Sequence, residues 1–252
     1  MPRKRTHEMA YKAENYTVMA NDIIRGKQSM TLQEARLIRL LITQVAQGDT
    51  DYQTYACRIG DLAEFLGVPK NNIYRDIPDI CKGLMQNVVY IGTGNKRSPW
   101  EMFHWVSQAK YDGKGTITLR LSDEIKPYVL ELEKWFTRYP LGNILAMRSY
   151  YSIRLYELIK CQDGVGRAEK DSIDFDVEAL RQACGCEGKF ERISQFKAKV
   201  IELAVQDINQ NTDIWVEVEY LKTGRRITDI RFHVHDKPKK RQKKQLPGQM
   251  EL

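Results

Sequence analysis

The chain has 252 residues, which is enough for one large domain or two of ordinary size. Hydrophobic residues make up 42% and charged residues 29%, and no apolar run approaches the ~20 residues needed to cross a bilayer, so the composition argues against a membrane-spanning protein. The net charge of +7 lies in the termini, because residues 237–252 sum to +5 and residues 1–8 to +2. Basic termini are typical of proteins that bind nucleic acid or an anionic membrane, and they are also common as solvated ends.

The N-terminal sequence MPRKRTHEM is basic but has no apolar stretch behind it, so it is not a secretory signal. We expect residues 1–14 to form a basic, flexible N-terminus and residues 237–252 a basic, disordered tail. The cysteines are odd in number and scattered, which indicates reduced thiols in a cytoplasmic protein. They are Cys57, Cys81, Cys161, Cys184 and Cys186.

The first half begins with a helix over Thr31–Ala46, in which Thr31 is the N-cap and Glu34 completes a capping box. The pattern then predicts, in chain order, a short strand at YACRI, helices over Ile59–Leu66 and Asn71–Gln86, strands over Trp100–Tyr111 and Thr116–Leu121, and a helix over 122–133. The turn DGKG joins the two longer strands as a hairpin. Residues 134–143, which contain Pro140 and Gly142, are expected to be a linker.

The second half repeats this order. The pattern predicts a helix over Ala146–Cys161, a strand over Ser172–Phe175, helices over Val177–Cys184 and Phe190–Asn209, and the strands IWVEVEYLK and ITDIRFHVH. Both first helices hold an I-R-L stretch, centred on Arg39 and Arg154, and corresponding elements lie roughly 115–120 residues apart.

Helix, strand, helix, helix and hairpin is the order of a winged helix, which is a helix-turn-helix backed by a small antiparallel sheet. Five elements in the same order, with the third helix the longest each time, indicate a duplication. We therefore predict an α+β fold of two tandem winged-helix domains, over residues 15–133 and 144–236.

In a helix-turn-helix the last helix enters the major groove, and its N-terminal residues reach base edges. In the helix over Phe190–Asn209 the residues expected to face inward are Ile193, Phe196, Val200, Leu203, Ala204 and Ile208. The candidates for DNA contact are basic or polar residues near its start, namely Lys189, Arg192, Ser194, Gln195, Lys197 and Lys199. Arginine can read guanine, glutamine can read adenine, and a helix N-terminus favours phosphate. The alternative is an ordinary amphipathic helix with a solvated basic face.

Further candidates lie in three places: the corresponding helix of the first half, the hairpin of the second half, and the first helix of the second half. They are Lys70, Asn71, Asn72, Tyr74 and Arg75, then Lys222, Arg225 and Arg226, and finally Arg154. The first group is a weaker signal because it has only two formal charges, and Asn71 can instead be a simple helix cap. The second group flanks a turn that can grip the DNA backbone or minor groove, and a first helix can cross the backbone. Two recognition helices on one face predict a site of ~20 base pairs.

Patterns of enzyme chemistry are weak in this sequence. His233-Val-His235 and Tyr156-x-x-x-Lys160 match the metal-binding and tyrosine motifs of rolling-circle nickases, but no tyrosine follows His235, where those enzymes usually carry it. GTGNK lacks the spacing of a P-loop, and Cys184-Gly-Cys186 lacks the second ligand pair of a zinc site. We therefore expect no catalytic residues, no cofactor and no metal.

Four stretches resemble the replication initiators of theta-replicating plasmids, the iteron-binding Rep proteins of the F-plasmid type. They are LIRLLI after a Thr-Leu start, DLAEFLGV before NIYRDI, MRSYYSIRLYE over Met147–Glu157, and FKAKVIELAVQDIN followed by two strands. The resemblance spans roughly residues 15–236. The family's helix can be arginine-rich just after the phenylalanine that matches Phe196, whereas this chain has Lys197, Ala198 and Lys199 there.

The resemblance implies a bacterial cytoplasmic protein of two winged helices that binds double-stranded DNA. Monomers of this family bind direct repeats, called iterons, at a plasmid origin, melt adjacent AT-rich DNA and help to load the host replicative helicase. Dimers bind inverted repeats and repress their own gene, and the first domain carries the dimer contacts. The resemblance also implies partnership with a host initiator and with chaperones that convert dimers to monomers.

The leading hypothesis is therefore a plasmid replication initiator that acts by binding and deforming DNA. One alternative is a transcriptional regulator built from the same two modules, without a role in initiation, and another is the rolling-circle nickase. The DNA around the gene distinguishes the first two hypotheses. Tandem repeats of ~20 base pairs beside an AT-rich stretch indicate initiation, and a lone operator indicates regulation.

Overall fold

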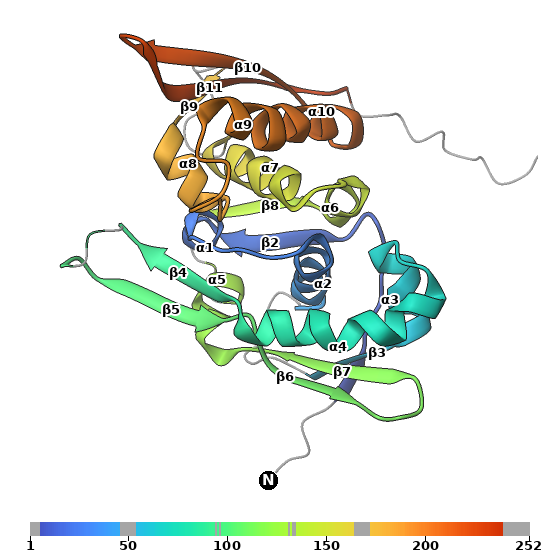
Figure 1. Cartoon of the computed structure of the whole chain (residues 1–252). Helices are drawn as coiled ribbons and strands as arrows, with labels where there is room; N and C mark the ends of the chain where they lie inside the picture. Colours follow the sequence, from blue (N-terminus) through green and yellow to red (C-terminus); the bar gives the residue numbers. More distant parts are fainter. Residues whose placement is uncertain are drawn as a thin grey trace, which may run out of the picture.

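The computed structural model describes residues 6–45, 54–93, 95, 97–130, 132, 135–163 and 172–238. The chain forms two winged-helix modules, one from each half of the sequence, with a pair of strands between them (Figure 1). In each module a first helix is followed by a strand, a second helix, a third helix and an antiparallel hairpin. The predicted α+β fold of two tandem winged helices is therefore confirmed.

The first module has a four-stranded sheet of order β1-β3-β7-β6. Its elements are β1 (Thr6–Glu8), α2 (Leu32–Thr43), β3 (Thr54–Arg58), α3 (Ile59–Leu66), α4 (Lys70–Gln86), β6 (Val106–Tyr111) and β7 (Thr116–Leu121). The capping box predicted for α2 is present, because the Thr31 hydroxyl accepts from the Glu34 amide at 3.2 Å and the Glu34 carboxylate accepts from the Thr31 amide at 2.9 Å.

The second module has a three-stranded sheet of order β10-β11-β9. Its elements are α7 (Tyr150–Asp163), β9 (Ser172–Asp176), α8 (Val177–Ala183), α9 (Ile193–Phe196), α10 (Glu202–Asn211), β10 (Ile214–Thr223) and β11 (Arg226–Asp236). A π-helical turn over Lys197–Ile201 joins α9 to α10, so these form one continuous third helix. Buried apolar side chains of both modules belong to one core cluster.

The prediction of a linker at 134–143 is wrong. This segment contains β8 (Phe136–Pro140), which pairs antiparallel with β2 (Tyr16–Ala20). A short helix follows each strand, α1 (Asn21–Arg25) after β2 and α6 (Leu141–Ala146) after β8. The two helices are only five and six residues long, which is less than two turns and too short to display a helical period in the sequence.

The strands of the first module also differ from the prediction. The run Trp100–Tyr111 is two strands, because the chain bends at the fully buried Trp105. The part before the bend, β5 (Trp100–His104), pairs with β4 (Val88–Gly92) in a separate ribbon, and only the part after it joins the main sheet as β6. The other difference is β1, which lies within the N-terminal segment expected to be flexible and pairs in parallel with β3.

The helix expected over 122–133 is shorter than predicted. It consists of a 3-10 turn, η1 (Asp123–Ile125), and a single helical turn, α5 (Lys126–Val129). The helix expected to start at Ala146 begins at Tyr150 instead, because the backbone of Met147 is extended after α6 ends. Residues 239–252 of the predicted tail lie outside the described residues.

The register of the β2–β8 pair indicates an approximate two-fold axis between the two modules. In the β2–β8 pair Tyr16 lies opposite Pro140, Val18 opposite Arg138 and Ala20 opposite Phe136. The beginning of each strand therefore faces the end of its counterpart, and the central residues of the two strands face each other. The axis passes through this central pair.

The helix caps show which residues of the two modules correspond. The hydroxyl of Thr31 caps α2, and the hydroxyl of Ser149 accepts from the Tyr151 amide at the start of α7. Counted from these caps, the counterpart of Arg154 is Arg36, five residues after the cap in each helix. The I-R-L match in the sequence paired the wrong arginine with Arg154.

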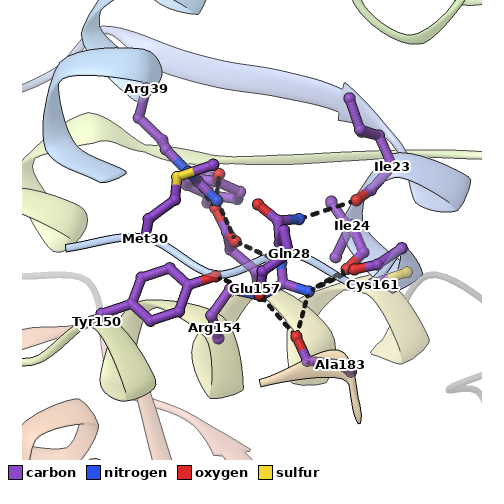
Figure 2. Close-up of polar contacts among 12 residues, drawn as sticks. Ile23, Ile24, Gln28, Met30, Arg39, Tyr150, Arg154, Glu157, Cys161 and Ala183 are labelled. Carbon is purple, nitrogen blue, oxygen red and sulfur yellow. Dashed lines mark hydrogen bonds and ion pairs between the residues drawn. The ribbon is translucent and has the colours of Figure 1, made fainter. Parts of the chain in front are cut away.

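Arg36 and Arg154 make equivalent contacts that join the modules. The Arg36 guanidinium donates to the carbonyl of Leu66, the last residue of α3, at 2.6 Å, and to two carbonyls at the end of α6. Arg154 donates to the carbonyl of Ala183, the last residue of α8, at 3.0 Å, and to two carbonyls at the end of α1 (Figure 2). Each arginine thus ties the second helix of its own module to the short helix of the other module. Helix carboxyl ends favour a cation there.

A fully buried ion pair lies between the first helices. Arg39 of α2 donates to both carboxylate oxygens of Glu157 of α7, at 2.9 and 2.8 Å, and neither side chain is exposed (Figure 2). Arg154 adds a third contact to this carboxylate at 3.1 Å, and the Tyr139 hydroxyl donates a fourth. Burial alone would raise the pKa of Glu157, but the two arginines hold it below its ordinary value. The carboxylate therefore stays charged and bridges the modules.

We predict that Glu157→Gln lowers the free energy of unfolding by about 3–5 kcal/mol, because it leaves two buried guanidinium groups without a counter-ion. Urea denaturation near neutral pH measures this change. In the matched control, Asp174→Asn removes a carboxylate from the exposed Arg231–Asp174 pair and is expected to cost much less. Equal losses in the two variants would contradict a stabilising role of the buried network.

The contribution of Glu157 also predicts a pH dependence. A carboxyl whose pKa is lowered by folding stabilises the native state above its ordinary pKa of 4.5, and this stabilisation is lost as the pH falls through the lower folded value. The difference in stability between the native chain and Glu157→Gln is therefore expected to be constant above about pH 5 and to shrink in stronger acid.

Candidate nucleic-acid interface

The third helix of the second module displays most of the candidate DNA contacts. Its start is exposed at Arg192, Ser194, Gln195 and Lys199, and Lys189 is exposed in the loop before it. Lys197 is half-buried, and its ammonium lies 3.9 Å from the centre of the Tyr220 ring on β10. The structure brings these six residues together at one end of the helix, and their contact with DNA stays a prediction.

The inward face of this helix matches the prediction in part, because Ile193 is half-buried and Leu203 is exposed. Phe196, Val200, Ala204 and Ile208 are buried as expected, but Leu203 is 51% exposed. Ile201 is buried instead, because the π turn over Lys197–Ile201 contains an extra residue and rotates the following part of the helix. The period of the sequence gave no sign of this turn.

The hairpin of the second module forms a basic wing beside the helix. Lys222, Arg225 and Arg226 are exposed at the turn between β10 and β11, where Gly224 has a φ of 64°. The helix is tied to this hairpin by Asn209, whose amide donates to the Val216 carbonyl at 2.8 Å and accepts from the Val216 amide at 2.7 Å. The helix and the wing are therefore held in a fixed relation.

The opposite face of this sheet has a different charge. Val216, Ile230 and Phe232 are buried against the helices, so the alternate side chains of the strands point outward. These outward side chains include Asp174, Glu217, Glu219, Arg231 and His233. Arg231 is paired with Asp174 at 2.7 Å, which leaves the outer face acidic. The charge distribution therefore favours approach of a polyanion to the side with the third helix and the wing.

The third helix of the first module, α4, is less basic. Lys70, Asn71, Tyr74 and Arg75 are exposed and Asn72 is half-buried. Arg75 is paired with its neighbour Asp76 at 2.7 Å, which weakens its field. The cap position of α4 is Pro69, so Asn71 is not a helix cap. The helix continues through Pro78 to Gln86.

Two candidates from the sequence are buried. Arg154 was expected to reach the DNA backbone, but its side chain is fully buried and contacts Glu157 and backbone carbonyls, so this prediction is wrong. Tyr156 is fully buried and its hydroxyl donates to Asp213 at 2.8 Å. Burial and this carboxylate raise the pKa of Tyr156 well above its ordinary value, which opposes its use as a nucleophile.

The remaining motifs do not gather into another site. Within the described residues, no group of three His, Cys, Asp or Glu side chains is placed to hold a metal ion. All five cysteines are free and buried, and burial raises the pKa of Cys184 to about 12, so it stays a thiol. Among the helices that the structure describes, none is long and apolar enough to cross a membrane.

Comparison with known proteins agrees with this architecture. Two family models match the chain, "Initiator Replication protein, WH1" over residues 16–160 and "Initiator Rep protein, WH2" over residues 176–234. A curated replication initiation protein of Escherichia coli is 23% identical over 223 residues, which covers 85% of this chain and 68% of that protein. The crystal structure of the Pi initiator protein in complex with iteron DNA has a TM-score of 0.72 and 19% identity, and the match covers 90% of this chain and 100% of that one.

The structural likeness shows the same fold, and the family models together span most of the chain. The resemblance found in the sequence is thereby confirmed. The chain belongs to the plasmid Rep family of replication initiators, which carry two DNA-binding winged-helix domains.

Proposed function

We propose that the chain starts plasmid replication by binding direct repeats at the origin with both winged helices, opening adjacent AT-rich DNA and helping to load the host replicative helicase. The observation that carries this proposal is the buried contact between the modules, which fixes two third helices and their wings in one orientation. The Pi initiator, which shares this fold, was crystallised with iteron DNA. A regulator that reads one operator has the same modules, so origin opening must be tested separately.

In this proposal the two modules have unequal roles. The second module provides base contacts through Gln195 and phosphate contacts through Lys199 and the wing, because its charges are exposed and close together. The first module has fewer unpaired charges, so it contributes mainly phosphate contacts through Lys70 and the start of α4. Contacts in two successive major grooves correspond to a repeat of ~20 base pairs.

Self-association of the first module is a further part of the proposal. β6 is the last strand in the sheet order β1-β3-β7-β6, and such an edge can pair with another chain. Beside it a groove of about 570 Å³ is lined by exposed apolar side chains, among them Tyr74, Met85 and Tyr111. In a dimer, a second chain paired with the β6 edge would cover the groove. This dimer would bind an inverted repeat and repress the chain's own gene. A species that stays monomeric at every concentration in sedimentation would contradict this part.

The DNA contacts predict a change in salt dependence. Each phosphate contact contributes about 1 to the slope of log affinity against log salt concentration. We expect Lys199→Ala to lower the slope by about 1 and the pair Arg225→Ala with Arg226→Ala by about 2. Glu217→Gln, which changes a charge on the outer face of the sheet, is the control and should leave the slope unchanged. Fluorescence anisotropy with a labelled repeat measures the slopes of all three variants. Unaltered slopes in the lysine and arginine variants would contradict the assigned interface.

An assay of origin opening distinguishes the initiator hypothesis from the regulator hypothesis. We expect the chain to make thymines in the AT-rich stretch beside the repeats reactive to permanganate on supercoiled DNA, and the reactivity to require the repeats. A control plasmid keeps the repeats and carries a GC-rich stretch in place of the AT-rich one. Tight repeat binding with no reactive thymines, even with host proteins added, would favour the regulator. A strand break joined to the protein would instead favour the nickase.

A further inference from the structure

The exposed leucine on the third helix of the second module is unexplained by packing. Leu203 is 51% exposed, in a helix in which Phe196, Val200 and Ile201 are buried. It lies on the exposed side of the helix, one turn after Lys199. An isolated exposed leucine is ordinary on a protein surface. This one lies on the helix that carries the candidate base contacts, so its position has a consequence for recognition.

The π turn is what places this leucine outside. In an uninterrupted α-helix, positions 196, 200 and 203 share one face, which would turn Leu203 toward the core. The extra residue in Lys197–Ile201 puts Ile201 into the core and turns Leu203 outward. π turns are rare and often occur at functional sites.

Two charged side chains near Leu203 contact Tyr220 on β10 and leave apolar surface between them and the solvent side of the helix. Lys197 lies against the ring of Tyr220 at 3.9 Å, and Glu202 accepts from the Tyr220 hydroxyl at 3.4 Å. Both charged groups are thereby directed toward β10. Ala198 is also exposed, and its small side chain permits close approach of a base pair. Ala198 and Leu203 therefore present apolar surface beside Lys199.

We propose that Leu203, together with Ala198, contacts thymine methyl groups in the major groove and so helps to determine the sequence that the chain binds. The thymine C5-methyl is the apolar group that the major groove displays, and alanine-type contacts to it are a known mode of readout. The ligand is a duplex because Lys199, Arg192 and the basic wing on the same side complement its phosphates. This inference rests on the proposed binding of origin repeats by the third helix.

The test replaces thymines of the repeat, one at a time, with deoxyuridine, which lacks only the methyl group. Wild-type chain is expected to lose about fourfold in affinity for each methyl that the leucine covers, the value for one buried carbon. For Leu203→Ala the same substitutions are expected to have little effect. Gln206→Ala, at an exposed position three residues further along the helix, is the control and should keep the wild-type pattern. Because Leu203 is largely exposed, circular dichroism should show all variants folded.

The outcomes separate this inference from the proposed function. Sensitivity to deoxyuridine at the same positions in wild-type chain and Leu203→Ala would overturn the role of the leucine, as would its absence in wild-type chain. Either result can occur while binding to the repeat remains specific. Equal affinity of wild-type chain for the repeat and for random DNA would instead contradict the proposed function, and the inference would fall with it.

Discussion

The carboxylate of Glu157 is the point on which the arrangement of the two modules depends. A charged group without solvent is tolerated only when other groups replace its hydration, and here two arginines and a tyrosine do so. Arg39 comes from the first module and Glu157 from the second, so the charges are satisfied only when α2 and α7 lie in one relation. Hydrophobic contact alone is non-directional and would permit the modules to slide. The ion pair therefore helps to fix the relation between the two third helices.

The duplication explains why this pair is asymmetric. Counted from the caps Thr31 and Ser149, Arg39 and Glu157 are equivalent positions, eight residues along each helix, and they meet near the axis between the modules. A residue at such an axis meets its own counterpart, so the same charge in both modules would face itself. An arginine in one module and a glutamate in the other turn this repulsion into attraction. Away from the axis the constraint is absent, and Arg36 and Arg154 perform the same task in both modules.

The sequence predicts well those features that depend on local periodicity. The capping box of α2, the limits of α3 and the final hairpin follow from residues close in the chain, and they match the structure. Features that depend on distant contacts were missed. β2 and β8 are strands because they pair with each other, and Arg154 is buried because carbonyls of the other module surround it. The π turn is a change of register within one helix, and it moved Leu203 from the predicted core to the surface. For the candidate site, residue types near the start of the third helix sufficed to predict the exposure of Arg192, Gln195 and Lys199, but not that Lys197 lies against the Tyr220 ring.

Two winged helices, held in one orientation by buried charges, are expected to bind a duplex together. Hydroxyl-radical footprinting on an origin repeat tests it most directly, because the cleavage pattern reports each stretch of backbone that the protein covers. We expect two protected tracts about one helical turn, or 10–10.5 base pairs, apart on the same face of the duplex. A single protected tract, or two tracts on opposite faces, would contradict it.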